Sequence, residues 1–239
     1  VDPLLNTWIL AWDHHSLVEQ PADLFQANIF APYADALAYS ENLLGSALLT
    51  LPLALATGLP VLSHNLTLLL GFALGGYTAH LLGRQVTRNE WAALLVGIIF
   101  TFNAYRLSMV PKVQMTTMQW FPLALLYLWR TTRGGRLRDA ALLALFAWLQ
   151  ALCSIYYAFY TALGLALLTP YFLLSRRPRL WQRFLATIGG AGLALLAFLP
   201  IALPYLRLSQ TLGLARSPAD AIPFSASLRQ WLLVAPDHL

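Results

Sequence analysis

The feature that most constrains this chain is its series of long apolar runs. Each run is about 17 to 23 residues long, close to the roughly 20 residues that a helix needs to cross about 30 Å of hydrocarbon. Hydrophobic residues make up 59% of the 239 residues and charged residues only 10%, whereas soluble domains carry roughly 25% charge. The sequence therefore predicts an all-α protein, a polytopic bundle of transmembrane helices.

About six of these runs are predicted to span the membrane. They cover residues 61–82, 91–107, 113–130, 139–153, 157–174 and 184–206. As a single helix, residues 139–174 would be about 54 Å long at 1.5 Å per residue, which is too long for one span. We therefore expect a hairpin that breaks near Ser154 to Tyr157, with arms too short to reach fully across.

The arginines predict which ends of the spans share a side. Ten of the fifteen basic residues lie in three short loops. Two pairs of spans connect these loops, so all three can face the cytoplasm, as the positive-inside rule requires. The loops hold Arg84 and Arg88; Arg130, Arg133, Arg136 and Arg138; and Arg176, Arg177, Arg179 and Arg183.

The N-terminal 41 residues have the opposite charge. They contain six of the ten acidic residues and no lysine or arginine, so we expect them outside the cytoplasm. This placement requires the apolar helix over residues 42–57 not to span, and Pro52, Gly58 and Pro60 would help it turn. Short interfacial helices are expected at Ile9–Trp12 and Leu24–Phe30.

These patterns divide the chain into three parts. Residues 1–60 form an extracytoplasmic loop with a non-spanning helix, 61–206 the transmembrane bundle, and 207–239 a truncated extracytoplasmic segment. Because the sequence opens at Val1 inside a polar segment, we expect a longer protein with at least one earlier span.

The charge distribution, the cysteine count and the missing motifs argue against several classes of function. The net charge of +5 comes from loop arginines, and without a basic stripe of interleaved aromatics we expect no nucleic-acid partner. The single cysteine, Cys153, excludes an internal disulfide. The chain has no Walker loop, nucleophile elbow or dinucleotide fingerprint.

The opening tetrad Asp2-Pro3-Leu4-Leu5, followed by Asn6, is the first candidate for chemistry. A carboxylate at the membrane boundary can act as a general base or bind a divalent cation. A cap for the helix after Pro3 explains the same residues.

The densest polar cluster is Trp12-Asp13-His14-His15. Asp13 can exchange a proton with a histidine, and Trp12 offers a stacking surface for a sugar ring. Adjacent histidines point to different faces of a helix, so they are poor joint metal ligands, and a polar loop at headgroup level remains the alternative.

A third group flanks the short outer turn after residues 91–107. Arg106 and Lys112, with Gln114 beside them, place positive charge on the acidic face, where a lipid phosphate is a natural ligand. Snorkelling of the two long side chains to the interface is the alternative.

Taken together, these features resemble the GT-C superfamily of membrane glycosyltransferases, especially its bacterial members. The resemblance rests on Asp2 before the outer-loop stretches 6–15 and 28–33, the helix 42–57 and the loop 84–88. Asp2-Pro3-x-x-Asn6 is also similar to the opening of oligosaccharyltransferase catalytic subunits, where the aspartate helps form the metal and acceptor site.

The resemblance implies a multi-pass enzyme of the bacterial plasma membrane that moves a sugar from a polyprenyl-phosphate-linked donor to an extracytoplasmic acceptor. It nominates Asp2 first and Asp13 second as catalytic carboxylates, with Arg106 or Lys112 on the carrier phosphate. Asn6, His14, His15 and Gln114 complete the candidate substrate site. Partners would be the donor and membrane lipids.

Two questions stay open at this point. Residues 1–60 contain no Asp-x-Asp or Glu-x-Asp pair, so use of a divalent metal is undecided and no other cofactor is expected. A non-enzymatic membrane protein, either a transporter or a subunit of an envelope-polymer machine, is the alternative function. Spans almost free of central charge and of repeats argue against the transporter.

Overall fold

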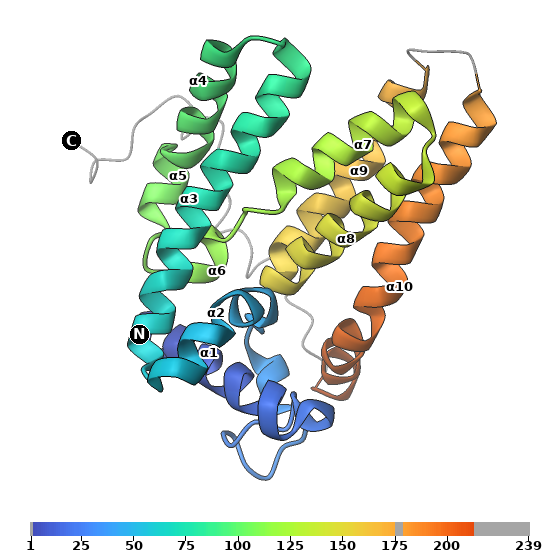
Figure 1. Cartoon of the computed structure of the whole chain (residues 1–239). Coiled ribbons are helices and arrows are strands. Elements are labelled where there is room, and N and C mark those ends of the chain that lie inside the picture. Colours follow the sequence, from blue (N-terminus) through green and yellow to red (C-terminus); the bar gives the residue numbers. More distant parts are fainter. Residues whose placement is uncertain (1, 175–178, 213–239) are drawn as a thin grey trace, which may run out of the picture.

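The computed structural model describes residues 2–174 and 179–212, and within them every regular element is a helix (Figure 1). The all-α prediction is confirmed. The elements in order are α1 (Asp2–Glu19), η1 (Pro21–Asp23), η2 (Ala36–Tyr39), α2 (Leu44–Thr57), α3 (Pro60–Thr87), α4 (Glu90–Thr101), α5 (Ala104–Ser108), α6 (Val113–Thr116), α7 (Phe121–Gly134), α8 (Leu137–Cys153), α9 (Ile155–Leu174) and α10 (Leu180–Leu212).

Four helical stretches are long and apolar enough to cross a membrane. They are residues Pro60–Thr87, Glu90–Ser108, Ile155–Leu174 and Leu180–Gln210. Helices α7 and α8 have only 14 and 17 residues. The structure thus supports a membrane protein, while the predicted number of six spans stays a prediction.

The predicted span 113–130 is not continuous: the short helix α6 is followed by a break before α7. Gln150 of α8 fills the break. Its amide oxygen accepts the backbone N–H groups of Trp120 (3.1 Å) and Phe121 (2.9 Å), and its amide nitrogen donates to the carbonyl of Thr117 (2.9 Å). A buried side chain therefore supplies hydrogen-bond partners to backbone groups where the helix is interrupted.

The predicted hairpin break at Ser154 is confirmed, but the second arm is longer than predicted, since α9 has 20 residues and is long enough to span. Ser154 has extended backbone angles between α8 and α9, and the carboxylate of Glu41 accepts the N–H of Ile155 at 3.2 Å. Helix α2 lies beneath this turn (Figure 1). Gly45 allows the contact, because a Cβ there would lie 2.7 Å from Sγ of Cys153 and 2.9 Å from its backbone nitrogen.

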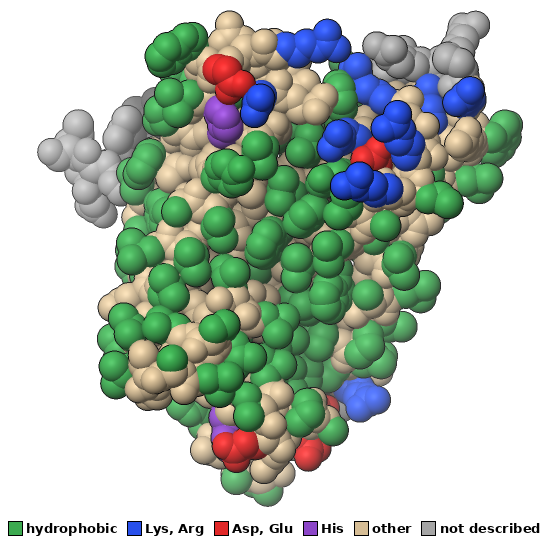
Figure 2. Space-filling view, in the orientation of Figure 1, with side chains coloured by type: hydrophobic (Ala, Val, Ile, Leu, Met, Phe, Trp, Pro, Cys, Tyr) green, Lys and Arg blue, Asp and Glu red, His purple; other side chains and the backbone are tan. Residues whose placement is uncertain are grey.

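Charge separates the two ends of the bundle (Figure 2). The α3–α4 and α7–α8 connections form what we call the basic end, where Arg84 pairs with Glu90 (2.7 Å) and Arg130 with Asp139 (3.9 Å). Helices α1 and α2 with residues 20–43 form the acidic end. That the first two basic loops share an end is as expected, while Arg176 and Arg177 of the third loop, like most of the predicted segment 207–239, lie outside the described residues. Which side of a membrane each end faces stays a prediction.

The N-terminal segment corrects one expectation. In place of a short helix at Ile9–Trp12, a single 18-residue helix runs from Asp2 to Glu19, and residues 24–30 are turns and bends rather than a helix. The buried positions of α1 are Asn6, Ile9, Leu10, Asp13, His14 and Ser16. They follow the helical period of 3.6, but because four of the six are polar, hydrophobicity does not reveal it.

Helix α2 agrees in position with the helix predicted at 42–57, and its not spanning the membrane stays a prediction. It has 14 residues, contains Pro52, and ends at Gly58 in the left-handed region, with φ of 64°. Its first turn packs with α1 and residues 24–38 in one hydrophobic core, which also takes in Val113 and Leu152. The acidic end is thus fastened to the rest of the bundle.

Candidate functional site

Five of the eight predicted site residues meet around the short helix α6. Residues Lys112 to Thr116 contact side chains from α1, α5 and α9, and we call this group the α6 hub. Its other members are Asp2, Asn6, Tyr105, Arg106 and Tyr157.

Helix α1 contributes two polar side chains one turn apart. Nδ2 of Asn6 donates to Oε1 of Gln114 at 2.9 Å, and the Asp2 carboxylate lies 3.9 Å from Nζ of Lys112. Both side chains of this ion pair are 47% exposed. Asp2 and Lys112 can therefore reach a ligand, whereas Asn6 is buried and orients the helix.

Arg106 lies inside the hub. Its Nη2 donates to the carbonyls of Gly71 (3.0 Å) and Thr116 (2.6 Å), and its Nη1 to that of Phe100 (3.3 Å). The guanidinium also stacks 4.5 Å from the centre of the Phe72 ring. This fully buried cation joins α3, α4 and α6, so in this structure it does not face a ligand.

The two tyrosines of the hub contact Met115. The Tyr157 hydroxyl donates to the Met115 carbonyl at 2.6 Å, and the Tyr105 hydroxyl lies 3.9 Å from its sulfur. The ring of Tyr160 lies 6.3 Å from that of Tyr157. Tyr105 and Tyr160 are 53% and 54% exposed, so the hub presents aromatic surface beside its charged pair.

Asp13 and His14 lie away from the hub, in the contact of α1 with α2. One oxygen of the fully buried Asp13 accepts the N–H of Leu43 at 3.1 Å, and its other oxygen has no partner. Burial raises the pKa of Asp13 to about 8, although the Leu43 bond opposes this. Nε2 of His14 lies 3.2 Å from the Ala47 carbonyl and 3.1 Å from the Thr50 hydroxyl, and burial lowers the pKa of His14.

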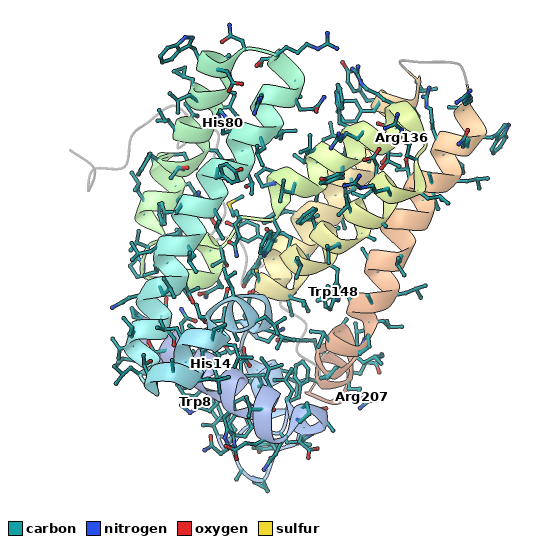
Figure 3. The ribbon with its side chains drawn as sticks, in the orientation of Figure 1. Trp8, His14, His80, Arg136, Trp148 and Arg207 are labelled. Carbon is teal, nitrogen blue, oxygen red and sulfur yellow. The ribbon has the colours of Figure 1, made fainter. Side chains whose placement is uncertain are left out.

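His15 lies on a different face of α1 from His14. Its Nδ1 lies 3.3 Å from the carboxylate of Glu19, and its ring packs at 5.5 Å against that of Trp12. Figure 3 shows His14 and Trp8 on α1 at the acidic end, with His80 and Arg136 at the basic end. The adjacent histidines therefore have separate surroundings, as predicted.

The two candidate carboxylates cannot act together on one substrate atom. Asp2 and Asp13 lie eleven residues apart on one straight helix, which separates them by about 16 Å at 1.5 Å per residue. Within the described residues, no three His, Cys, Asp or Glu side chains come together as a metal site. The hub accordingly offers one accessible carboxylate beside one ammonium group.

Sequence reasoning missed a second junction, at residues 41–43. Glu41 caps α9, Leu43 donates to Asp13, and Asn42 donates from its backbone and its amide to the Tyr205 hydroxyl at 2.8 and 2.9 Å. Burial raises the pKa of Glu41, and the N–H groups of Ile155 and Tyr156 oppose this. Three adjacent residues thus hold α1, α9 and α10 together, which no local pattern indicates.

An apolar groove of about 830 Å³ lies between α9 and α10, with α8 as its floor. Its lining runs along α9 from Ala158 to Leu174 and contains no ionisable side chain. At 1.5 Å per residue this is about 24 Å, most of the roughly 30 Å hydrocarbon thickness. The groove can bind an apolar chain but cannot react with it.

The groove and the hub both include residues of the first turn of α9. Tyr157 belongs to the hub, the next residue lines the groove, and Glu41 caps the same turn. A scan against protein-family models and searches of curated proteins and solved structures gave no match to this chain.

Proposed function

We propose that this chain is part of a GT-C-type glycosyltransferase that moves a sugar from a polyprenyl-phosphate-linked donor to an acceptor at the acidic end. The observation that supports it best is that a long apolar groove and a polar, accessible hub both include residues of the first turn of α9. A lipid-linked sugar has the same two parts, a long apolar chain and a charged head.

In the proposed reaction, Asp2 is the general base. Its carboxylate takes the proton of the acceptor hydroxyl as that oxygen attacks the anomeric carbon of the donor sugar. The bond from that carbon to the carrier phosphate breaks, and the phosphate leaves with the electron pair. Lys112, 3.9 Å from Asp2, stabilises the added negative charge.

In this proposal the other candidates have supporting roles. The Nη donors of Arg106 are used by three carbonyls, so its part is to hold α6 in position. Gln114 and Asn6 orient the first turns of α1 through their 2.9 Å bond. Asp13 and His14 are buried in the contact with α2 and serve the fold.

The groove would hold the carrier chain. Its length of about 24 Å exceeds one bilayer leaflet, roughly half of 30 Å, so an isoprenoid chain uses it more fully than an ordinary acyl chain does. The protein would lie in the bacterial plasma membrane, with the acidic end outside.

The decisive experiment is transfer of a radiolabelled hexose from polyprenyl phosphate to the glycan fraction of a cell envelope, using the intact protein in lipid vesicles. We expect Asp2→Asn to lower the rate at least 100-fold, within the range of about 10² to 10⁴ for loss of a general base. Asp13→Asn should keep most of the activity. Full activity in Asp2→Asn would overturn the mechanism.

A second variant tests the groove separately. Ala162→Trp should fill it and raise KM for the donor more than it lowers kcat, whereas Leu95→Trp on the exposed face of α4 should change neither. Uptake of labelled solute into the vesicles without any sugar transfer would support a transporter instead.

A further inference from the structure

Three exposed aromatic rings gather on the loop that follows α1. Phe30, Tyr33 and Tyr39 are 55%, 61% and 36% exposed. The Tyr39 ring lies between the other two, 5.4 Å from that of Phe30 and 6.2 Å from that of Tyr33, tilted by 47° and 54°. We call these three side chains the aromatic platform.

The loop beneath the platform is firmly held. Its inward side chains Leu24, Phe25 and Leu37 are buried in the core of the acidic end. The Trp12 indole donates to the Leu24 carbonyl at 2.8 Å, and the Leu37 N–H to the Phe25 carbonyl at 3.1 Å. The outward rings are therefore fixed in place before any ligand arrives.

The backbone of the loop has left-handed angles on both sides of Tyr33. Phe30 and Asp35 have φ of 58° and 53°, in the left-handed region that a phenylalanine rarely adopts. The Gln26 amide donates to Asp35 at 2.9 Å and accepts its N–H at 3.1 Å, which holds this shape. Residues held in this region cluster at active sites and ligand clamps.

The chemistry of the surroundings discriminates between two occupants. Exposed Asp23 and half-buried Asp35 lie in the same loop, which itself contains no lysine or arginine, while Arg207 of α10 lies at the same end of the bundle (Figure 3). Insertion into a phosphate-bearing lipid surface favours basic neighbours instead. A sugar fits both the exposed rings and the nearby carboxylates. Its C–H groups pack on the negative face of an aromatic ring, and its hydroxyls donate to carboxylates and amides.

We propose that the aromatic platform binds the glycan that serves as acceptor. This proposal deepens the proposed function. That the bound glycan is the acceptor rests on the proposed function. Trp12, which anchors the loop, lies ten residues from Asp2 along α1, about 15 Å at 1.5 Å per residue. A single sugar cannot cover that distance, so the acceptor is an oligosaccharide or polysaccharide.

The test measures glycan binding without any donor. A β-1,4-linked glucose hexamer and a β-1,4-linked N-acetylglucosamine hexamer are titrated into the intact protein in lipid nanodiscs, and binding is followed by saturation-transfer NMR. We expect at least one hexamer to bind, and the double variant Phe30→Ala/Tyr33→Ala to weaken that binding at least tenfold. Binding of neither hexamer, or equal binding by the double variant, overturns the proposal.

A matched variant keeps the result specific. Trp91→Ala removes an aromatic ring that is 81% exposed at the basic end, and it should bind the hexamer like the wild type. Transfer by Asp2→Asn tests the catalytic mechanism, and hexamer binding by Phe30→Ala/Tyr33→Ala tests the platform. The proposed function and this inference can therefore fail separately.

A spin label decides between sugar and membrane. It is attached at Ala34→Cys, between the rings, in a Cys153→Ser background that leaves one thiol. Collision with a water-soluble nickel complex is expected to exceed collision with oxygen, which concentrates in lipid. The reverse would identify the platform as a membrane anchor and overturn the glycan proposal.

Discussion

Two positions on helix α1 place the same kind of side chain in opposite surroundings. Asp2, in the first turn, is 47% exposed and faces Lys112 at 3.9 Å. Asp13 is fully buried, has one backbone N–H as its partner and one oxygen without any. A carboxylate in an acidic, polar segment is therefore not a sufficient sign of a reactive group. What matters is whether a substrate can reach it.

The comparison extends to the two cations of the α6 hub. Lys112 is half exposed and forms an ion pair that water screens, whereas Arg106 is buried and bonded to three carbonyls. Exposed pairs contribute little to stability and remain free to bind ligands. Buried charges hold structure and are costly to remove. Three predictions test this division and one tests the contact beneath the α8–α9 turn, from the largest expected effect to the smallest.

The first prediction concerns stability against pH. Because burial raises the pKa of Asp13 from 3.8 to about 8, the folded state keeps a proton that the unfolded chain releases between these values. The unfolding free energy should fall as pH rises through this window, by at most about 1.4 kcal/mol per pH unit, and level off above pH 8. Unfolding in denaturant at a series of pH values measures the slope.

Asp13→Asn should remove most of that slope, since the amide does not titrate. Asp2→Asn serves as the matched control and should retain the slope of the wild type. A slope that survives unchanged in Asp13→Asn would show that another group is responsible, and the contrast between the two aspartates would then lose its energetic basis.

The second prediction compares the two hub cations. Arg106→Gln should lower the unfolding free energy by about 2 to 4 kcal/mol, because several charge-assisted bonds to buried carbonyls are lost. Lys112→Gln should change it by less than about 1 kcal/mol. Thermal unfolding of both variants in the same detergent measures the difference, and similar losses would contradict it.

The third prediction concerns the contact beneath the α8–α9 turn. Gly45→Ala should cost about 1 to 3 kcal/mol, because the new Cβ would lie 2.7 Å from Sγ and 2.9 Å from the backbone nitrogen of Cys153. Gly189→Ala is the control, since nothing lies within 4 Å of a Cβ there. Unfolding midpoints of the two variants provide the measurement, and a neutral Gly45→Ala would mean that α2 can move away from α8.

The smallest effect is expected across the polar face of α1. A double-mutant cycle of Asn6→Ala and Gln114→Ala should show a coupling of about 1 kcal/mol, the usual net value of a hydrogen bond. The same cycle for Asp2→Ala and Lys112→Ala should give about 0.5 kcal/mol or less. A stronger coupling in the exposed pair would reverse the assignment of structural and ligand-facing roles.

Part of this fold could be read from local sequence. The break at Ser154, the short helix at 44–57 and the clustering of arginines at one end all follow from run length, proline position and charge. Helix α1 could not be found in this way, because polar side chains occupy its buried face. The interruption before α7 could not be predicted from local sequence either, because Gln150, about 30 residues away, stabilises it.

By itself, the sequence determined that this protein is an all-helical membrane bundle with one acidic and one basic end, because helix length, hydrophobicity and charge act within a few turns of chain. Only the tertiary structure decided which candidate residues meet. Asn6 and Gln114 are 108 positions apart and yet share a hydrogen bond, while Asp13, on the same helix as Asp2, is buried. Burial and long-range contact depend on how helices pack, and packing sums many weak interactions between segments that are distant in sequence.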